Sequence, residues 1–176
     1  KEGAYAFALP PSDRERLSER LRAGLETGGA GEGAEEDDKD RLAAIGASGD
    51  GAYLSWYLEI VSGSGPVGLK REAVKDISNI KEKSQYFTGD QLEDIRIMAL
   101  APETDPALRR DLVLLLGDYY LVFPEAATAA WRAVAADTSL DNISRAFATD
   151  SLNHLLKEDD PLPDVSEEEW AAYYSS

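Results

Sequence analysis

The pattern closest to a known chemical motif is segment 63–68, which reads Gly-Ser-Gly-Pro-Val-Gly. This G-x-G-x-x-G spacing is that of a dinucleotide-binding turn, whose glycines permit a tight bend and close approach to a pyrophosphate. The same turn needs close helix–strand packing, which the long charged side chains of residues 70–72 oppose. A second hydrophobic strand ending in an acid does not follow. The sequence therefore favours a loop rich in Gly and Pro.

The single histidine, His154, is the second candidate for chemistry. One histidine excludes metal sites and catalytic pairs that need two. No serine lies in a G-x-S-x-G elbow, so the sequence offers no nucleophile for His154 to activate. On a helix, Asp150 lies one turn before it and Glu158 one turn after it, which indicates an ion-paired position on the helix flank.

Carboxylates are numerous, but their spacing defines neither a catalytic nor a calcium site. General acid–base catalysis needs two carboxylates that converge in a pocket, whereas Asp111 and Asp118 are spaced along one helix. Residues 159–169 lack the alternating ligands and central glycine of an EF-hand loop. The chain has no cysteine, which excludes disulfides, thiolate metal sites and cysteine nucleophiles. We predict no catalytic residue, no metal site and no cofactor.

The composition indicates which partners suit the chain. Its 176 residues include 34 acidic and 18 basic side chains, for a net charge of -16, and 43% are hydrophobic, enough for a domain-sized core. Nucleic acids and anionic membranes are bound through Lys and Arg, so both are disfavoured and a basic protein is favoured. The longest apolar runs, such as 112–116, are far shorter than the ~20 residues of a membrane span.

The start of the chain bears on its origin. It opens at Lys1 without a charged-then-apolar leader. We therefore expect either a fragment or a mature form whose presequence has been removed. The sequence predicts a soluble protein, cytoplasmic or processed into an organelle, and does not choose between these locations.

The charge is unevenly distributed along the chain. Residues 1–40 carry 6 basic and 11 acidic side chains, residues 41–89 carry 6 and 5, and residues 90–176 carry 6 and 18. The net charges of these segments are -5, +1 and -12. A partner that recognises acidic side chains is therefore expected to meet the C-terminal half.

The N-terminal segments read as a helix followed by a linker. Ser12 and Glu15 form a capping box for a helix over 12–27, along which leucines recur every four residues. Residues 28–40 are glycine-rich and then acidic, which is typical of a flexible linker. Residues 1–27 are thus predicted to be an amphipathic helical arm, which either folds back on the body or docks on a partner.

The body is predicted to span residues 41–157. Helices are expected over 42–45 and 53–61, although the second, apolar nearly all round, is either a central buried helix or a strand. A helix expected over 67–84 carries a local basic stretch, formed by Lys70, Arg71, Lys75, Lys81 and Lys83.

Clearer signals punctuate the C-terminal half of this body. Asp90 with Glu93 is expected to cap one helix, and Asp105 followed by proline another. Pro124 starts a third helix, and Ser139 or Asp141 caps a fourth. The connections are short, so successive helices should pack as antiparallel hairpins.

A weak internal repeat links these helices. Shifting residues 95–116 by 36 positions places Asp105 on Asp141 and Arg109 on Arg145. A two-helix period of this size is typical of α-solenoids. The Asp-x-x-x-Arg pattern resembles the HEAT-like (armadillo-type) α-helical repeat over about residues 90–157. The resemblance implies that these four side chains tie neighbouring hairpins together and are not catalytic. A plain helical bundle would show similar caps and remains an alternative.

Residues 158–176 read as an acidic tail with a short aromatic helix. Ser166 and Glu169 form a second capping box there. So short a helix cannot bury its aromatic side chains alone, so it either packs back on the body or anchors a partner inside an acidic rim. The candidate partner-binding residues are Asp111, Asp118, Asp150, Glu158, Asp159, Asp160, Glu167, Glu168, Glu169, Trp170, Tyr173 and Tyr174.

We predict an all-α protein of about seven or eight helices, built from antiparallel hairpins as a HEAT-like α-solenoid or a bundle. The expected function is a non-catalytic protein-binding module: an accessory, adaptor or inhibitory subunit that docks on a basic partner through its acidic C-terminal half. Narrower alternatives are a peripheral subunit of a large, possibly organellar, complex and an immunity-type inhibitor of a basic toxin. An alternative from another class is a nucleotide-cofactor-binding enzyme that uses the loop Gly63 to Gly68.

Overall fold

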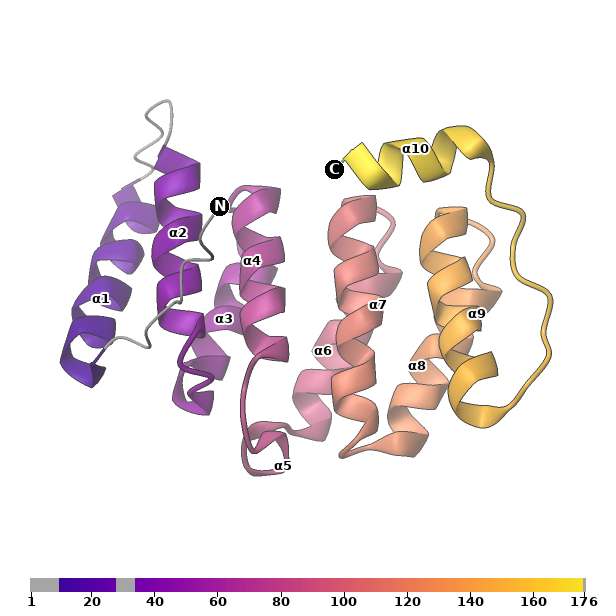
Figure 1. Cartoon of the computed structure of the whole chain (residues 1–176), viewed down its shortest axis with the longest axis horizontal. Coiled ribbons are helices and arrows are strands. Elements are labelled where there is room, and N and C mark those ends of the chain that lie inside the picture. Colours follow the sequence, from indigo (N-terminus) through magenta and orange to yellow (C-terminus); the bar gives the residue numbers. More distant parts are fainter. Residues whose placement is uncertain (1–9, 28–33, 176) are drawn as a thin grey trace, which may run out of the picture. The chain divides into compact units, whose positions relative to one another are not determined.

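A computed structural model describes residues 10–27 and 34–175, and these residues form an all-α protein (Figure 1). Across both ranges there are ten α-helices and one short 3-10 helix, and no strand. The predicted fold class is therefore confirmed. The chain divides into two compact units, residues 1–82 and 83–176.

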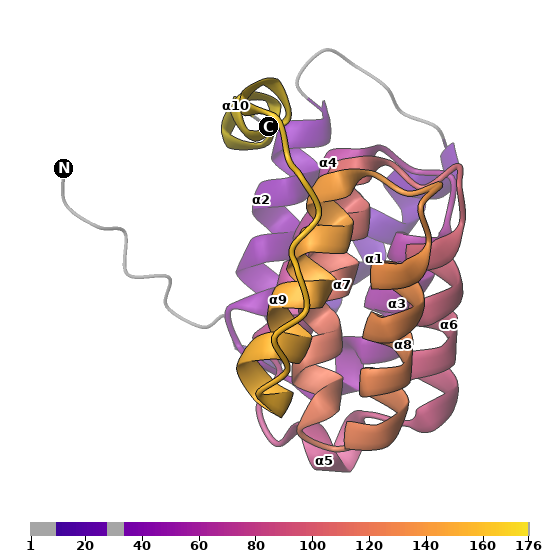
Figure 2. The same cartoon turned by 90° about the vertical axis from the view of Figure 1, so that its right-hand side faces the viewer.

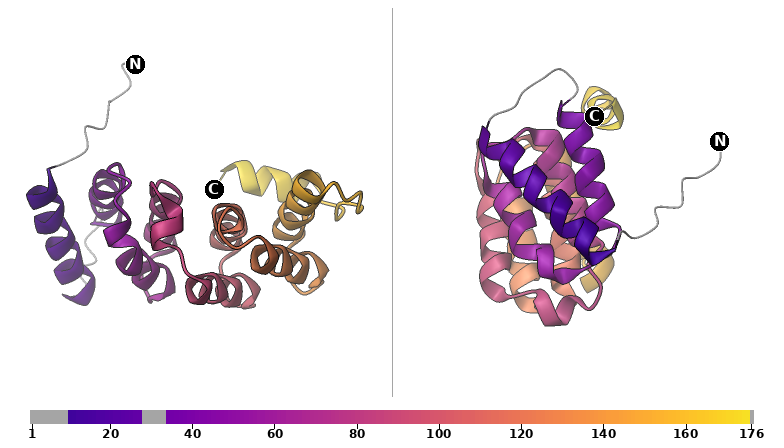
Figure 3. Two further views of the ribbon diagram at one scale, coloured as in Figure 1. Left: turned by 90° about the horizontal axis from the view of Figure 1, so that it is seen from below. Right: turned by 90° about the vertical axis from the view of Figure 1, so that its left-hand side faces the viewer.

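The first unit contains two helical hairpins. Its helices are α1 (Pro11–Thr27), α2 (Ala34–Gly46), the 3-10 helix Gly51–Tyr53, α3 (Leu54–Ser62) and α4 (Val67–Ser78). Helix α1 packs against α2, α3 packs against α4, and α2 also packs against α4. The contact between α2 and α4 thus joins the two hairpins (Figure 3).

The core of this unit explains why α3 is a helix and not a strand. Its buried side chains Trp56, Tyr57, Ile60 and Val61 recur at helical spacing. The 3-10 helix that precedes it is capped by Asp50, whose carboxylate accepts a hydrogen bond from the Ala52 amide at 3.0 Å.

The second unit stacks two further hairpins in two layers. Its helices are α5 (Lys83–Tyr86), α6 (Gly89–Leu100), α7 (Pro106–Tyr120), α8 (Pro124–Ala136), α9 (Asn142–Leu156) and α10 (Glu167–Ser175). Helix α6 lies beside α8, and α7 lies beside α9 (Figures 1 and 3). Trp131 of α8 is buried between the layers, and its indole donates a hydrogen bond to the Val113 carbonyl at 3.0 Å.

The caps of helices α6, α7 and α9 follow the sequence signals in two of three cases. Asp105 and Asp141 cap α7 and α9 as predicted. The predicted cap of α6 by Asp90 with Glu93 is wrong. Thr88 caps this helix in a capping box with Gln91, because the T-x-x-Q pattern begins two residues earlier.

The structure differs from the predicted domain boundaries in three places. Of the predicted linker 28–40, residues 34–40 are part of helix α2, and 28–33 lie outside the described residues. Acidic residues near a helix N-terminus favour the helix, and the pairs Glu36–Lys39 and Asp38–Arg41 support it. The predicted helix 67–84 is interrupted after Ser78, and the predicted body 41–157 is divided between the two units.

Two further observations bear on the expected organisation. Helix α1, predicted as an arm that either folds back on the body or docks on a partner, packs against α2. Ten helices replace the predicted seven or eight in the described ranges, partly because α5 follows the left-handed residue Glu82, whose φ is 55°. No helix in the same ranges is long and apolar enough to cross a membrane.

Candidate interaction surface

A buried arginine ties the two hairpins of the second unit together. Arg109 of α7 has a relative exposure of 3%. Its Nε donates to the Ala99 carbonyl at 3.0 Å, and Nη2 donates to the Ala101 carbonyl at 2.9 Å. Its Nη1 forms an ion pair with Asp141 Oδ2 at 2.7 Å. One guanidinium therefore holds the C-terminal end of α6 against the N-terminal cap of α9.

Asp141 serves both the ion pair and the helix start. Its Oδ1 accepts from the Ser144 amide at 2.8 Å, and Oδ2 accepts from the Ser144 hydroxyl at 2.9 Å. These contacts satisfy an amide that the first turn of a helix leaves without an intrahelical partner. Both oxygens of the carboxylate therefore make structural contacts.

The sequence offset of 36 residues reappears as a repeated contact. Arg109 Nε donates to the Ala99 carbonyl, and Arg145 Nε donates to the Ala135 carbonyl at 3.2 Å. The second contact differs, because Arg145 Nη1 donates to the Asn142 side chain at 3.2 Å where Arg109 meets a carboxylate. Arg109 and Asp141 make the tie between neighbouring hairpins that the resemblance implies, whereas Arg145 bonds Ala135 and Asn142 of its own hairpin and Asp105 caps α7.

The other candidates for chemistry belong to different units of the chain. Segment 63–68 runs from the end of α3 into the first turn of α4, so it follows a helix and not the strand of a dinucleotide-binding turn. His154 is exposed in the last turn of α9, where its backbone carbonyl accepts from Lys157 Nζ at 3.0 Å. No three His, Cys, Asp or Glu side chains of the described ranges are placed to hold a metal ion.

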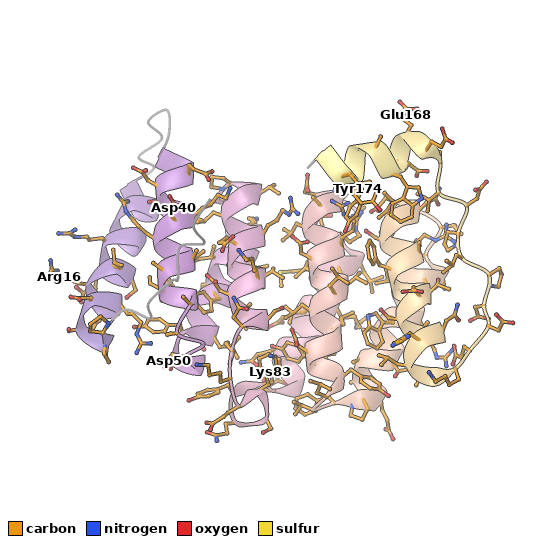
Figure 4. All side chains as sticks on the ribbon, in the orientation of Figure 1. Arg16, Asp40, Asp50, Lys83, Glu168 and Tyr174 are labelled. Carbon is orange, nitrogen blue, oxygen red and sulfur yellow. The ribbon has the colours of Figure 1, made fainter. Side chains whose placement is uncertain are left out.

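The predicted partner-binding acids occupy several places on the second unit. Asp111 is half-buried on α7, and Asp118 of the same helix pairs with Lys83 at 3.4 Å. Glu158 pairs with Arg132 of α8. Five others are exposed on α9, on the segment after it, and at the start of α10: Asp150, Asp159, Asp160, Glu167 and Glu168. Glu168 points away from the helix layers (Figure 4).

Helix α10 packs on its own unit through one of its aromatic rings. Tyr173 lies 5.7 Å from Phe147 of α9 between ring centroids, and the Arg110 guanidinium lies 4.1 Å from the Tyr173 centroid. This is a cation–π geometry. Trp170 is half-buried, whereas Tyr174 is 80% exposed. Of the three predicted aromatic anchors, Tyr174 presents its ring most openly to solvent.

The segment that leads to α10 returns past α9 and is fixed by a residue that the sequence reasoning missed (Figure 2). Asn153 Nδ2 donates to the Asp160 carbonyl at 2.9 Å, and its Oδ1 accepts from the Asp160 amide at 3.1 Å. Ser166 and Glu169 form the predicted capping box. Hydrogen bonds from the Ser166 amide and hydroxyl lower the pKa of Glu169.

The basic side chains of the second unit are engaged within it. Residues 83–176 contain 7 basic and 18 acidic side chains, a net charge of -11. The seven that make contacts inside the unit are Lys83, Arg96, Arg109, Arg110, Arg132, Arg145 and Lys157. The contact between Arg96 and Glu93 lowers the pKa of Glu93 through its hydrogen bonds. The excess of carboxylates therefore gives this unit a negative surface.

Comparison of the chain with family models, with curated proteins and with solved structures finds no match in any of the three. Function is therefore argued from the chain's own geometry and charge.

The docking of α10 leads to a first prediction. Replacing Tyr173 by alanine removes the ring that contacts both Phe147 and Arg110, so α10 should lose amide protection by about tenfold. The matched control is Tyr174→Ala, whose ring is 80% exposed and lies against Trp170 and Tyr173 of the same helix, so the loss of protection should be much smaller. Hydrogen exchange of the peptide covering α10 measures both variants. Equal effects of the two substitutions would contradict this account of how α10 docks.

Proposed function

We propose that the chain is a non-catalytic protein-binding module, an accessory, adaptor or inhibitory subunit that docks on a basic protein through its second unit. The observation that carries this proposal is the engagement of all seven basic side chains of that unit within it, against 18 acidic ones. A surface with this excess of carboxylates repels acidic molecules and attracts basic ones.

We also infer that the hairpins α6–α7 and α8–α9 form a HEAT-like pair. The repeated contact of Arg109 with Ala99 and of Arg145 with Ala135 supports this inference, as do the caps Asp105 and Asp141. In such repeats each hairpin buries its apolar side against the next, and the outer surface is available for a partner.

The docking surface is proposed to centre on the exposed start of α10. Glu167 and Glu168 are exposed there, and Tyr174 exposes its ring one to two turns further along the helix. Aromatic side chains near carboxylates are suited to a partner segment that combines Lys or Arg with apolar residues.

Salt dependence of binding tests this proposal. The partner is first isolated by affinity purification from the native source, and its association rate is then measured by surface plasmon resonance. The rate should fall by at least about tenfold between low and physiological ionic strength, because salt screens long-range attraction. The variant Glu167→Lys with Glu168→Lys should slow association further at low salt.

A matched control uses an exposed acid of the first unit. Glu19 lies on α1, and Glu19→Lys adds a positive charge to the other unit. This control should leave the association rate close to that of the unmodified chain. An association rate insensitive to salt, or equally slowed by both charge reversals, would contradict docking through the acidic second unit.

A further inference from the structure

A buried carboxyl group lies at the contact between the hairpins of the first unit. Asp76 is in the last turn of α4 and is 2% exposed. Gly46, the last residue of α2, faces it. A Cβ on Gly46 would lie 1.9 Å from Asp76 Oδ1 and 2.6 Å from Oδ2, so the carboxyl group occupies the space that a side chain would need. The two helices approach this closely only because Gly46 has no side chain.

The surroundings of Asp76 do not neutralise a negative charge. Its Oδ2 is buried without a hydrogen-bond partner. On its own helix, Lys75 Nζ is bonded to Glu72 at 3.0 Å, so that cation is already shared with another carboxylate. The last turn of α2, residues 42–46, has no charged side chain.

The groups near Asp76 on the remaining elements also do not stabilise its ionised form. Tyr57 of α3 is buried nearby, and burial together with the charge of Asp76 raises the pKa of its phenol. Beyond it lie Tyr53 and Asp50, and Asp50 holds Arg14 of α1 in an ion pair at 3.4 Å. Lys81, past the end of α4, is exposed. In the part of the chain that the structure describes, no cation therefore forms an ion pair with Asp76.

Helix polarity adds to this effect. Asp76 lies near the C-terminal end of α4, and Gly46 forms the C-terminal end of α2. The carbonyl ends of helices carry partial negative charge, which disfavours a nearby carboxylate. Burial, followed by the charge of Glu72, raises the pKa of Asp76 to about 8, and Lys75 opposes this shift.

We propose that Asp76 is a proton-controlled joint between the two hairpins of the first unit. The neutral acid lets α2 lie against α4, and loss of its proton to solvent separates α2, with α1, from α3 and α4. The joint is held closed in acid, and its opening becomes more favourable as the pH rises toward the weakly alkaline range.

Whether the first unit gains or loses stability as the pH rises depends on which state, folded or unfolded, binds the proton of Asp76 more tightly. In the unfolded chain the carboxyl titrates near 3.8, whereas in the closed joint it keeps its proton up to about 8. The folded state therefore binds more protons than the unfolded state between these values. The stabilising contribution is complete below about 4, declines as pH rises, and is lost once pH exceeds about 8.

Two measurements on the full chain test the joint. In the unmodified protein, carbon-detected NMR should show one aspartate carboxyl with a midpoint near 8, absent from the Asp76→Asn variant. Hydrogen exchange, corrected for the intrinsic pH dependence of amide exchange, should show protection of residues 42–46 falling by up to about tenfold per pH unit between about pH 6 and about pH 8.

Matched variants decide the outcome. Asp76→Asn keeps the shape of the neutral acid and should make the protection of α2 independent of pH. Glu59→Gln removes an exposed carboxylate of α3 and should behave like the unmodified chain. A midpoint near 4 for the Asp76 carboxyl would overturn the proposed joint. The proposal would also fail if the protection of α2 fell with rising pH as steeply in Asp76→Asn as in the unmodified chain. The titration of the unmodified chain decides the question even if a variant fails to fold.

Discussion

Replacing Arg109 by methionine is expected to destabilise the second unit by about 3–5 kcal/mol, because it removes one partner of a buried ion pair. Methionine fills a similar volume, so the loss reflects the guanidinium and not a cavity. Asp141 would lose its cation, and the carbonyls of Ala99 and Ala101 would lose their donor. Since small domains are stable by only about 5–15 kcal/mol, much of the unit's stability depends on this one side chain.

The matched control is Arg145→Met. Arg145 makes the equivalent contact to the Ala135 carbonyl but meets the amide of Asn142 instead of a carboxylate, and it is only half-buried. We expect this variant to cost about 1 kcal/mol. Urea-dependent hydrogen exchange of peptides from α6 to α9 separates the second unit from the first. Equal losses in the two variants would contradict the special role of the pair between Arg109 and Asp141.

Replacing Gly46 by alanine is expected to destabilise the first unit by about 3 kcal/mol, although alanine usually stabilises a helix relative to glycine by about 1 kcal/mol. The reversal of sign is expected because the new Cβ would lie 1.9 Å from Asp76 Oδ1. Thermal unfolding followed by circular dichroism measures the effect. A rise in the melting temperature of Gly46→Ala would show that the carboxyl group moves away at little cost.

Two companion variants identify the cause. At Gly65, a Cβ would meet nothing within 4 Å, so Gly65→Ala should change stability little. The double variant Gly46→Ala with Asp76→Ala removes the clashing carboxyl group and should recover most of the loss. A double variant as unstable as Gly46→Ala alone would place the clash elsewhere.

The features of the second unit that the sequence indicates are those governed by local chemistry. Asp105 and Asp141 cap helices because their side chains accept hydrogen bonds from amides two or three residues ahead, and this needs no knowledge of the fold. The offset of 36 residues between the two hairpins could also be found in the sequence, because residues of the same type recur at that one spacing. That Arg109 meets Asp141 was expected only through the resemblance to known repeats.

Features that depend on the register between helices could not be read in this way. On the sequence, Asp76 is one more polar residue of a basic helix, and Gly46 is part of a glycine-containing break. Their contact depends on the angle and offset at which α2 and α4 pack, which sequence periodicity does not determine. The role of Asn153 could not be predicted either, because its side chain bonds the backbone of Asp160 and not a side chain.

The sequence predicts the net charge of the candidate surface but not which of its acids are paired or how its aromatic helix packs. The excess of acids after residue 90 is a property of composition. Which acids have cationic partners is decided by packing, which brings Lys83 to Asp118 and Arg132 to Glu158. The sequence left the aromatic helix with two alternatives, and its ring contacts with Phe147 and Arg110 depend on how the preceding segment turns.

The shared carboxylate of Asp141 also bears on cooperativity. One side chain starts α9 and, through Arg109, anchors α6 and α7. If the hairpin α6–α7 unfolds, Asp141 at the N-terminus of α9 loses its ion pair. If the N-terminus of α9 frays, the charge of Arg109 is left without its counterion. Each hairpin is therefore less stable without its neighbour, which is a favourable nearest-neighbour coupling in the sense used for repeat arrays. Helices α6 to α9 should unfold in one transition instead of two.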